Sequence, residues 1–173
     1  MKRIVITGAN GSGKSHTAAR FSKVRPDVPV ISFDAIKLTT GWQQKPRSEV
    51  EMALQSKISQ DAWILEGGPS LLPLAMEAAD AVVWLDPLEA VRTWRLIQRP
   101  WRFRGETRPE LPKDNVDWPL QQYQFAWRSL KKRHQFRHSI TEALAHSADT
   151  RIWHCRSAED VENAVKAWGG EGR

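Results

Sequence analysis

The chain has 173 residues, of which 40% are hydrophobic and 27% are charged, a composition that predicts a soluble globular domain with a core of its own. No apolar run approaches the length of a transmembrane helix, and the apolar run after Met1-Lys2-Arg3 is too short for a signal-peptide core. A single cysteine, Cys155, excludes an internal disulfide and favours a reducing, cytoplasmic setting. The net charge is +6, with five of the six excess positive charges in residues 87–173, so the expected partners are polyanions such as nucleotides or nucleic acid.

Strand-like apolar runs alternate with helical patterns along the chain. The runs lie at residues 4–7, 30–33, 63–66, 82–85 and 151–154. Alternation of this kind predicts an α/β fold in which helices connect the strands of a parallel sheet by right-handed crossovers. We therefore expect a single domain over residues 1–168, with residues 169–173 as a disordered tail.

The helical patterns have recognisable starts and ends. They cover residues 14–24, a segment from about 48 to 58, a segment from 86 onwards, one long segment from about 118 to 145, and a last one from 158 to about 168. Ser48 opens a capping-box pattern, and Asp86 is the expected N-cap of the third helix. The stretches between helices at residues 34–47 and 100–119 are predicted to be irregular, and long loops in a compact domain are often functional.

The segment between the first strand and the first helix carries the most specific motif. Its sequence, Gly8-Ala9-Asn10-Gly11-Ser12-Gly13-Lys14-Ser15, fits the phosphate-binding pattern G-x-x-x-x-G-K-[ST]. Glycines let backbone N–H groups curl around a phosphate at the positive end of the helix dipole. Lys14 can reach the β- and γ-phosphates of a nucleotide, and the Ser15 hydroxyl can ligate Mg²⁺. The predicted nucleotide contacts are Gly8, Asn10, Gly11, Ser12, Gly13, Lys14, Ser15 and His16.

Three carboxylates follow the carboxyl ends of predicted strands, which is where ligands of parallel sheets bind. Asp34 is expected to hold or deprotonate an acceptor hydroxyl, with an Asx turn as the alternative. Glu66 is expected to organise Mg²⁺ or the substrate, with a helix cap or a buried ion pair as the alternative. Gly67 and Gly68 would let that substrate approach the backbone closely. For Asp86 the helix N-cap is preferred over a metal-binding or catalytic role.

Arginines are concentrated after the fourth strand, with six in residues 92–108. Arg92, Arg95 and Arg99 share one helical face, opposite Ala90, Val91, Trp94 and Ile97. A solvated polar face opposite a core face, or an anion-binding patch, would explain this pattern. We favour a lid over residues 100–119 that closes on a nucleotide, because phosphoryl transfer needs positive charge in a water-excluded site. Arg104 and Arg108 are then predicted to be catalytic, Arg99 to bind the nucleotide, and Arg92 and Arg95 to bind the substrate.

Two further groups of residues carry weaker expectations. Trp42, in an irregular stretch, is predicted to stack on a flat substrate. The long helix carries a second basic cluster, made of Arg128, Lys131, Lys132, Arg133 and Arg137 with His134 and His138. We interpret this cluster as a solvated face, with binding to a phosphate backbone as the alternative. The histidines and Cys155 lack metal-ligand spacing, so no structural zinc is expected.

These motifs together resemble the small P-loop proteins related to adenylate and shikimate kinases, and among them a bacterial group labelled DNA topology modulation proteins. The resemblance covers almost the full chain and rests on the P-loop, on Trp63-Ile64-Leu65-Glu66-Gly67, on Val82-Val83-Trp84-Leu85-Asp86 and on Arg104-Gly105-Glu106-Thr107-Arg108-Pro109. It implies a three-layer P-loop NTPase fold, with helices on both faces of a five-stranded parallel sheet in the order 2-3-1-4-5 and a lid near residues 100–119. It also implies that Arg156, after the last strand, lies near the adenine of a bound ATP.

The sequence therefore predicts an ATP-dependent phosphotransferase that uses Mg²⁺, held by Ser15 and Glu66, and transfers the γ-phosphoryl group to a small acceptor. The acceptor, a nucleotide, nucleoside or sugar-like molecule, would bind in the region of residues 34–60. The third strand ends in Glu-Gly-Gly, where nucleotide kinases usually carry Asp-Gly and shikimate kinases Gly-Gly-Gly, so the acceptor is left open. The alternatives are an ATP-binding, nucleic-acid-associated regulator with little kinase activity, which we do not favour, and a bare NTPase.

Overall fold

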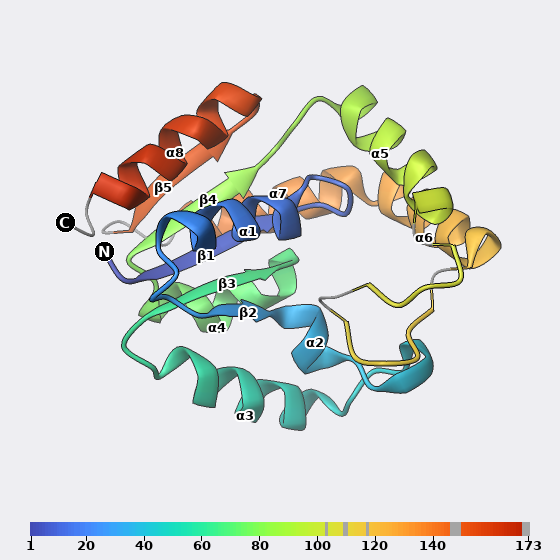
Figure 1. Ribbon diagram of the computed structural model, residues 1–173, viewed down its shortest axis with the longest axis horizontal. Coiled ribbons are helices and arrows are strands. Elements are labelled where there is room, and N and C mark those ends of the chain that lie inside the picture. The colour runs from blue at the N-terminus through green and yellow to red at the C-terminus, as the bar shows by residue number, and fades with distance from the viewer. Residues whose placement is uncertain (103, 109–110, 117, 146–149, 171–173) are drawn as a thin grey trace.

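The computed structural model describes residues 1–173 except 103, 109–110, 117, 146–149 and 171–173. Its strands are β1 (Arg3–Gly8), β2 (Val30–Ser32), β3 (Trp63–Gly67), β4 (Ala81–Leu85) and β5 (Arg151–Cys155). They pair in parallel in the order β2-β3-β1-β4-β5, with β1 at the centre (Figure 1). The predicted fold class and strand order are confirmed, and each strand ends within about one residue of its expected position.

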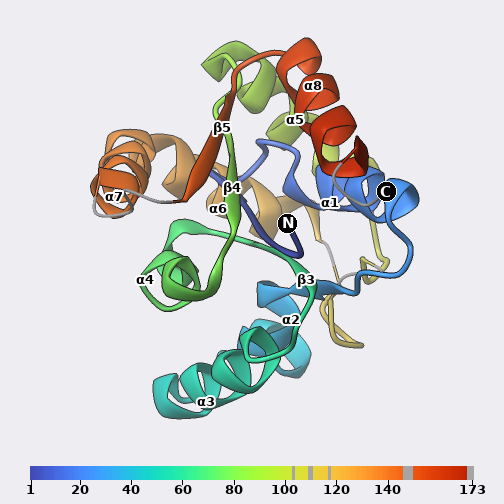
Figure 2. The same cartoon turned by 90° about the vertical axis from the view of Figure 1, so that its left-hand side faces the viewer.

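Helices cover both faces of this sheet (Figure 2). One face carries α1 (Lys14–Val24) and α8 (Ala158–Gly170), and the other carries α3 (Arg47–Ile58), α4 (Leu72–Ala75) and α7 (Arg133–Ala145). Beyond the carboxyl ends of the strands, α5 (Glu89–Arg102) packs against α6 (Pro119–Lys131). The short helix α2 (Phe33–Lys37) follows β2, and 3-10 turns lie at Thr40–Trp42, Pro69–Leu71 and Met76–Ala78.

The core consists of two apolar layers, because successive side chains of a strand point to opposite faces of the sheet. Ile4 and Ile6 of β1 point into the layer beneath α1 and α8, whereas Val5 points into the layer beneath α3, α4 and α7. Both faces are covered, which explains why the strands are continuous apolar runs. Within the described residues, no helix combines the length and the apolar character that crossing a membrane requires.

Two helices differ from the prediction: one is interrupted in its interior, and the other begins later than expected. The helix expected over residues 118–145 is interrupted at Lys132, whose backbone leaves the helical region between α6 and α7. The third helix begins at Glu89 and not at Asp86, because the Asp86 carboxylate accepts a hydrogen bond from Arg137 instead of capping the helix. The break at Lys132 turns α7 back onto the sheet, where it packs against β1 and α4.

Two helix ends also correct the prediction. Helix α3 begins at Arg47, after Pro46, and no side chain caps it, so the capping box expected at Ser48 does not form. Helix α8 continues through Gly169 and Gly170, which were expected to belong to a disordered tail. The rest of that expected tail, residues 171–173, lies outside the described residues.

The thiol of Cys155 gives a simple test of the packing at the end of β5. Burial, and after it the negative charge of Asp160, raises the pKa of the Cys155 thiol to about 11. Because only the thiolate reacts, we expect iodoacetamide at about pH 8 to label the folded protein roughly a hundredfold more slowly than the urea-unfolded chain. Mass spectrometry of timed samples measures both rates, and equal rates would contradict the buried position.

Candidate functional site

The candidate site is built at the end of the central strand. The register pairs Ile6 of β1 with Glu66 of β3, and Gly8 of β1 with Leu85 of β4. The phosphate-binding loop therefore leaves the sheet between the carboxyl ends of β3 and β4. This position brings residues that follow both neighbouring strands within reach of the loop.

Two glycines of the loop are required by its shape. Gly13 has a φ of 103°, which side chains rarely adopt, and the chain turns there directly into α1. Gly11 has a φ of 83°, and a Cβ built on it would lie 2.8 Å from Leu96 Cγ and 3.1 Å from the carbonyl oxygen of Arg92. Helix α5 thus packs closely on the loop, and a side chain at position 11 would push it away.

The Lys14 ammonium lies against its own loop. Its Nζ donates hydrogen bonds to the carbonyl oxygens of Gly8, at 3.1 Å, and of Ala9, at 3.2 Å. Burial is the largest influence on this amine and lowers its pKa below the usual value. The loop carbonyls hold the amine at the mouth of the loop, where an incoming phosphate oxygen could replace them.

Four charged side chains from four separate segments shift the pKa of Lys14. The carboxylates of Glu66 and Asp34 raise its pKa, and the guanidinium groups of Arg99 and Arg108 lower it. The sequence predicted a role for each of these residues, and the structure brings all of them to one place. They come from β3, α2, α5 and the segment between α5 and α6.

Ser15 and Glu66 form the part of the site that fits a magnesium ion. The Ser15 hydroxyl donates to Glu66 Oε2 at 3.4 Å, and Glu66 is buried. Among the described residues, no three His, Cys, Asp or Glu side chains form a group that could hold a metal ion by themselves. This donor set suits Mg²⁺, which commonly takes one or two protein ligands and completes its shell with phosphate oxygens and water.

The acceptor side of the site differs in detail from the prediction. Asp34 lies in the first turn of α2, not in a loop, and its side chain is exposed. The absence of a side chain at Gly67 is explained by packing, since a Cβ there would lie 2.4 Å from Leu71 Cδ2 and 2.6 Å from Phe33 Cβ. At Gly68, in contrast, a Cβ would meet nothing within 4 Å, so this backbone is open to a ligand.

The arginine face of α5 lies along the phosphate-binding loop, with Arg92 buried, Arg99 half-buried and Arg95 exposed. Arg92 is only 3% exposed and pairs with Glu89. Arg95 Nη1 donates to the carbonyl oxygen of Ser12 at 2.9 Å, and Arg99 is close enough to Lys14 to lower its pKa. The stripe therefore surrounds the loop with positive charge.

The opposite face of α5 is exposed, so it is not the core face that the interpretation of the arginines as a solvated face required. Val91, Trp94 and Ile97 are all exposed, Trp94 by 60%. Besides Arg92, the residues that α5 contributes to the interior are Leu96 and Pro100. The two faces could not be assigned from the sequence, because the pattern alone does not say which one is covered.

A single buried asparagine joins the predicted lid to the segment after β2. Asn115, which is 0% exposed, accepts a hydrogen bond at Oδ1 from the backbone N–H of Trp42 at 2.6 Å. Its Nδ2 donates to the carbonyl oxygens of Thr39, at 2.7 Å, and Pro112, at 2.9 Å. Trp42 Nε1 in turn donates to the carbonyl oxygen of Val116 at 3.0 Å. We call this set of contacts the Asn115 latch.

The ring of Trp42 packs within the protein. The Arg108 guanidinium lies 5.5 Å from the centroid of the Trp42 ring, and the Phe125 ring lies 5.8 Å from it. Arg108 itself is buried, at 7% exposure. In this arrangement Trp42 supports Arg108, so the structure does not favour the stacking on a substrate that the sequence predicted.

Other predicted site residues do not join this cluster. His16 and Asn10 are exposed at the surface of α1 and of the loop. Arg104 is exposed and lies over the ring of Trp101, 5.8 Å from its centroid. Arg156, which follows β5, lines a cavity that Lys14 and Asp34 do not line.

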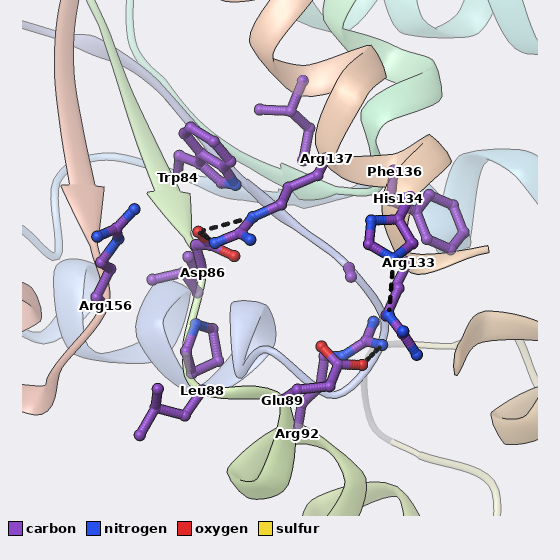
Figure 3. A pocket seen from close by; sticks show the side chains of 14 residues that line it. Trp84, Asp86, Leu88, Glu89, Arg92, Arg133, His134, Phe136, Arg137 and Arg156 are labelled. Atoms are coloured by element: carbon purple, nitrogen blue, oxygen red, sulfur yellow. Dashed lines mark hydrogen bonds and ion pairs between the residues drawn. The ribbon is translucent and has the colours of Figure 1, made fainter. Parts of the chain in front are cut away.

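Asp86 belongs to a separate network rather than to a helix cap. Its Oδ2 accepts a hydrogen bond from Arg137 Nη2 at 2.5 Å and lies 3.0 Å from His154 Nε2. The His154 ring stacks on Trp84 with a centroid distance of 4.0 Å. Figure 3 shows how Trp84, Asp86 and Arg137 border a cavity that Arg156 also lines.

Several solved structures have an architecture similar to that of this chain. A shikimate kinase from Bacteroides thetaiotaomicron matches with a TM-score of 0.53 and 20% identity, over 98% of this chain and 97% of that one. A gluconokinase from Sinorhizobium meliloti 1021 matches with a TM-score of 0.54 and 16% identity, over 98% and 92% of the two chains. The protein TT1252 from Thermus thermophilus matches with a TM-score of 0.54 and 18% identity, over 97% of this chain and 96% of that one. The chain has the fold of the P-loop kinases.

At these identities the similarity concerns the fold and not the substrate. No protein-family model and no curated protein sequence matches the chain. Membership of the DNA topology modulation group therefore stays a prediction.

Two elements of this region were not anticipated from the sequence. Asn115 lies in a polar, proline-containing stretch, and nothing in that stretch points to Trp42, which is 73 residues away in the sequence. The pairing of Asp86 with Arg137 likewise joins residues that are 51 positions apart. Neither pair has a local signal, because each joins segments that are far apart in the sequence.

We expect Asn115→Ala to open the contact between the predicted lid and the segment after β2. The Trp42 backbone N–H would lose its acceptor, and a lost hydrogen bond costs about 1 kcal/mol or more. Hydrogen–deuterium exchange at Trp42 should then accelerate about fivefold or more. The neighbouring exposed Lys113→Ala is the control and should leave exchange unchanged; unchanged exchange at Trp42 in Asn115→Ala would show that the latch does not hold this segment.

Proposed function

We propose that this protein is an ATP-dependent phosphotransferase that uses Mg²⁺ and acts on a small acceptor with a hydroxyl group. The observation that carries the proposal is the convergence of two carboxylates and two arginines on Lys14, at the first turn of α1. Phosphoryl transfer is catalysed mainly by positioning and by stabilising charge, and this set of groups supplies both.

The loop and the start of α1 would hold the phosphates of ATP. Backbone N–H groups of the loop and the helix dipole favour an anion there. Lys14 would exchange the carbonyl oxygens of Gly8 and Ala9 for phosphate oxygens. Ser15 and Glu66 would hold Mg²⁺, which when bound neutralises charge on the phosphate oxygens.

Asp34 would hold the acceptor hydroxyl and take up its proton. Its carboxylate is exposed on α2, beside Lys14, and the backbone at Gly68 is open to a ligand on the same side of the sheet. We therefore keep residues 34–60 as the acceptor-binding region. A carboxylate next to a hydroxyl that attacks phosphorus is the usual arrangement for general-base assistance.

Arg99 and Arg108 would stabilise negative charge on the transferring phosphoryl group. The positive charges of both arginines lower the pKa of Lys14. Arg108 is buried, and its guanidinium lies over the ring of Trp42. A planar guanidinium in a site with little water is well suited to this role. The segment from residue 100 to 119 acts as the lid in this proposal, with the Asn115 latch holding it over the acceptor region.

Replacement of Lys14 tests the nucleotide site directly. We expect Lys14→Ala to weaken Mg·ATP binding by about a hundredfold or more, because charge-assisted hydrogen bonds to phosphate are lost. Isothermal titration calorimetry measures the affinity, and circular dichroism checks the fold. Lys23→Ala, at the exposed end of the same helix, should bind normally. An unchanged affinity in Lys14→Ala would mean that the loop is not the nucleotide site.

Turnover tests the role of Arg108. A screen of ATP consumption over nucleosides, nucleotides and sugars should identify an acceptor, and Arg108→Ala should then lower kcat about a hundredfold or more with little change in ATP affinity. Arg128→Ala, an exposed arginine on α6, should keep normal turnover. If no acceptor raises ATP consumption above background in the folded protein, the phosphotransferase proposal fails.

A further inference from the structure

A cavity of about 350 Å³ lies beside the phosphate-binding loop, on the α7 side of the sheet (Figure 3). Its lining includes Trp84 and Ile140, which belong to the apolar layer beneath α7, whereas α1 packs in the opposite layer. Of the phosphate-binding loop it touches Ala9; Lys14 and Asp34 do not line it. The cavity is therefore distinct from the cluster around Lys14.

Arginines dominate the polar part of this cavity. Arg92 comes from α5, Arg133 and Arg137 from α7, and Arg156 from the end of β5. The carboxylates that line it are Asp86, which pairs with Arg137, and Glu89, which pairs with Arg92. Four guanidinium groups thus face two carboxylates.

The two remaining arginines have no carboxylate partner in the part of the chain that the structure describes. Arg133 Nε donates to His134 Nε2 at 3.1 Å, a neutral acceptor when the ring is uncharged. The side chain of Arg156 forms no ion pair there, although its backbone N–H donates to Asp160. The cavity therefore carries an excess of about two positive charges, which favours a ligand of opposite charge.

Arg92 adds an independent indication of a missing acceptor. It is 3% exposed, and its Nε and Nη1 find no hydrogen-bond acceptor among the described residues. Buried N–H groups without an acceptor destabilise a protein by about 1–3 kcal/mol each. An oxyanion at this end of the cavity would supply the acceptor after a small movement of the side chain.

The rest of the lining is apolar and partly flat. Trp84 and Phe136 contribute aromatic rings, and Pro87 and Leu88 contribute aliphatic surface. The Trp84 ring is held in place by stacking on His154. Walls of this kind bind a planar ring, which aromatic side chains contact over a large area.

We propose that this cavity binds a phosphate monoester attached to a planar ring, at the same time as a nucleotide occupies the phosphate-binding loop. A monoester carries about −1.5 to −2 charges near pH 7, which suits a cavity with an excess of arginines. Arg133 contacts the phosphate together with Arg92, which lies next to it, and the ring lies against Phe136 on the same side of the cavity (Figure 3). This ligand site goes beyond the proposed phosphotransferase reaction and does not require it.

Phenyl phosphate is a suitable probe, because it joins a ring to a phosphate monoester. With the loop saturated by Mg·AMP-PNP, calorimetry should show one phenyl phosphate bound per chain. Inorganic phosphate should bind more weakly, since it lacks the ring, and phenol should not bind detectably. Binding should also persist in Lys14→Ala, so a failure of the nucleotide site would not be mistaken for a failure of this one.

Two neighbouring charges on the same stretch of chain give a matched pair of variants. Arg133→Gln should weaken phenyl phosphate binding tenfold or more, whereas Lys132→Gln removes an equal charge outside the cavity and should leave it unchanged. Phe136→Ala should weaken phenyl phosphate but not inorganic phosphate. The proposal is overturned if Mg·AMP-PNP displaces the probe, if both charge variants weaken it equally, or if millimolar probe does not bind.

Discussion

The contact of the half-buried Lys14 ammonium with its own loop is the interaction on which the candidate site depends. A cation removed from water is costly unless oxygen atoms and opposite charges lie close to it. The loop carbonyls provide the oxygen atoms, and Glu66 and Asp34 provide the opposite charges. Because β3 ends beside the central strand and β2 ends beside β3, the parallel sheet brings both carboxylates to the same amine.

Helix α5 shows how such a site reverses the usual orientation of an amphipathic helix. Its arginine stripe lies along the phosphate-binding loop, where Arg92 is buried and the exposed Arg95 donates to the carbonyl oxygen of Ser12, and its apolar stripe with Trp94 remains at the surface. A basic face turned inward is stable only where oxygen atoms or carboxylates receive it, as Glu89 receives Arg92. Helix α5 therefore packs mainly on the phosphate-binding loop and contributes little to the apolar core.

The break at Lys132 separates what the sequence presents as one basic cluster. On α6, Lys131 lies over the ring of Trp127, 5.2 Å from its centroid, while on α7 Arg133 and Arg137 line the cavity beside the phosphate-binding loop. The basic side chains of α7 are exposed, as the prediction of a solvated face requires. Two basic regions with different surroundings result, and the one on α7 borders a cavity that Trp84, Phe136 and the buried Arg92 also line.

The sequence by itself determined the parallel sheet, the position of each strand and the phosphate-binding loop, because apolar runs and a glycine motif are local patterns. It also indicated Lys14, Asp34 and Glu66, since residues that follow parallel strands meet at one edge, and it indicated Arg108 through the concentration of arginines in the expected lid. The inward face of α5, the Asn115 latch and the break at Lys132 were decided by the tertiary structure alone. Periodicity shows that a helix has two faces, but contacts between segments distant in the sequence decide which face is buried.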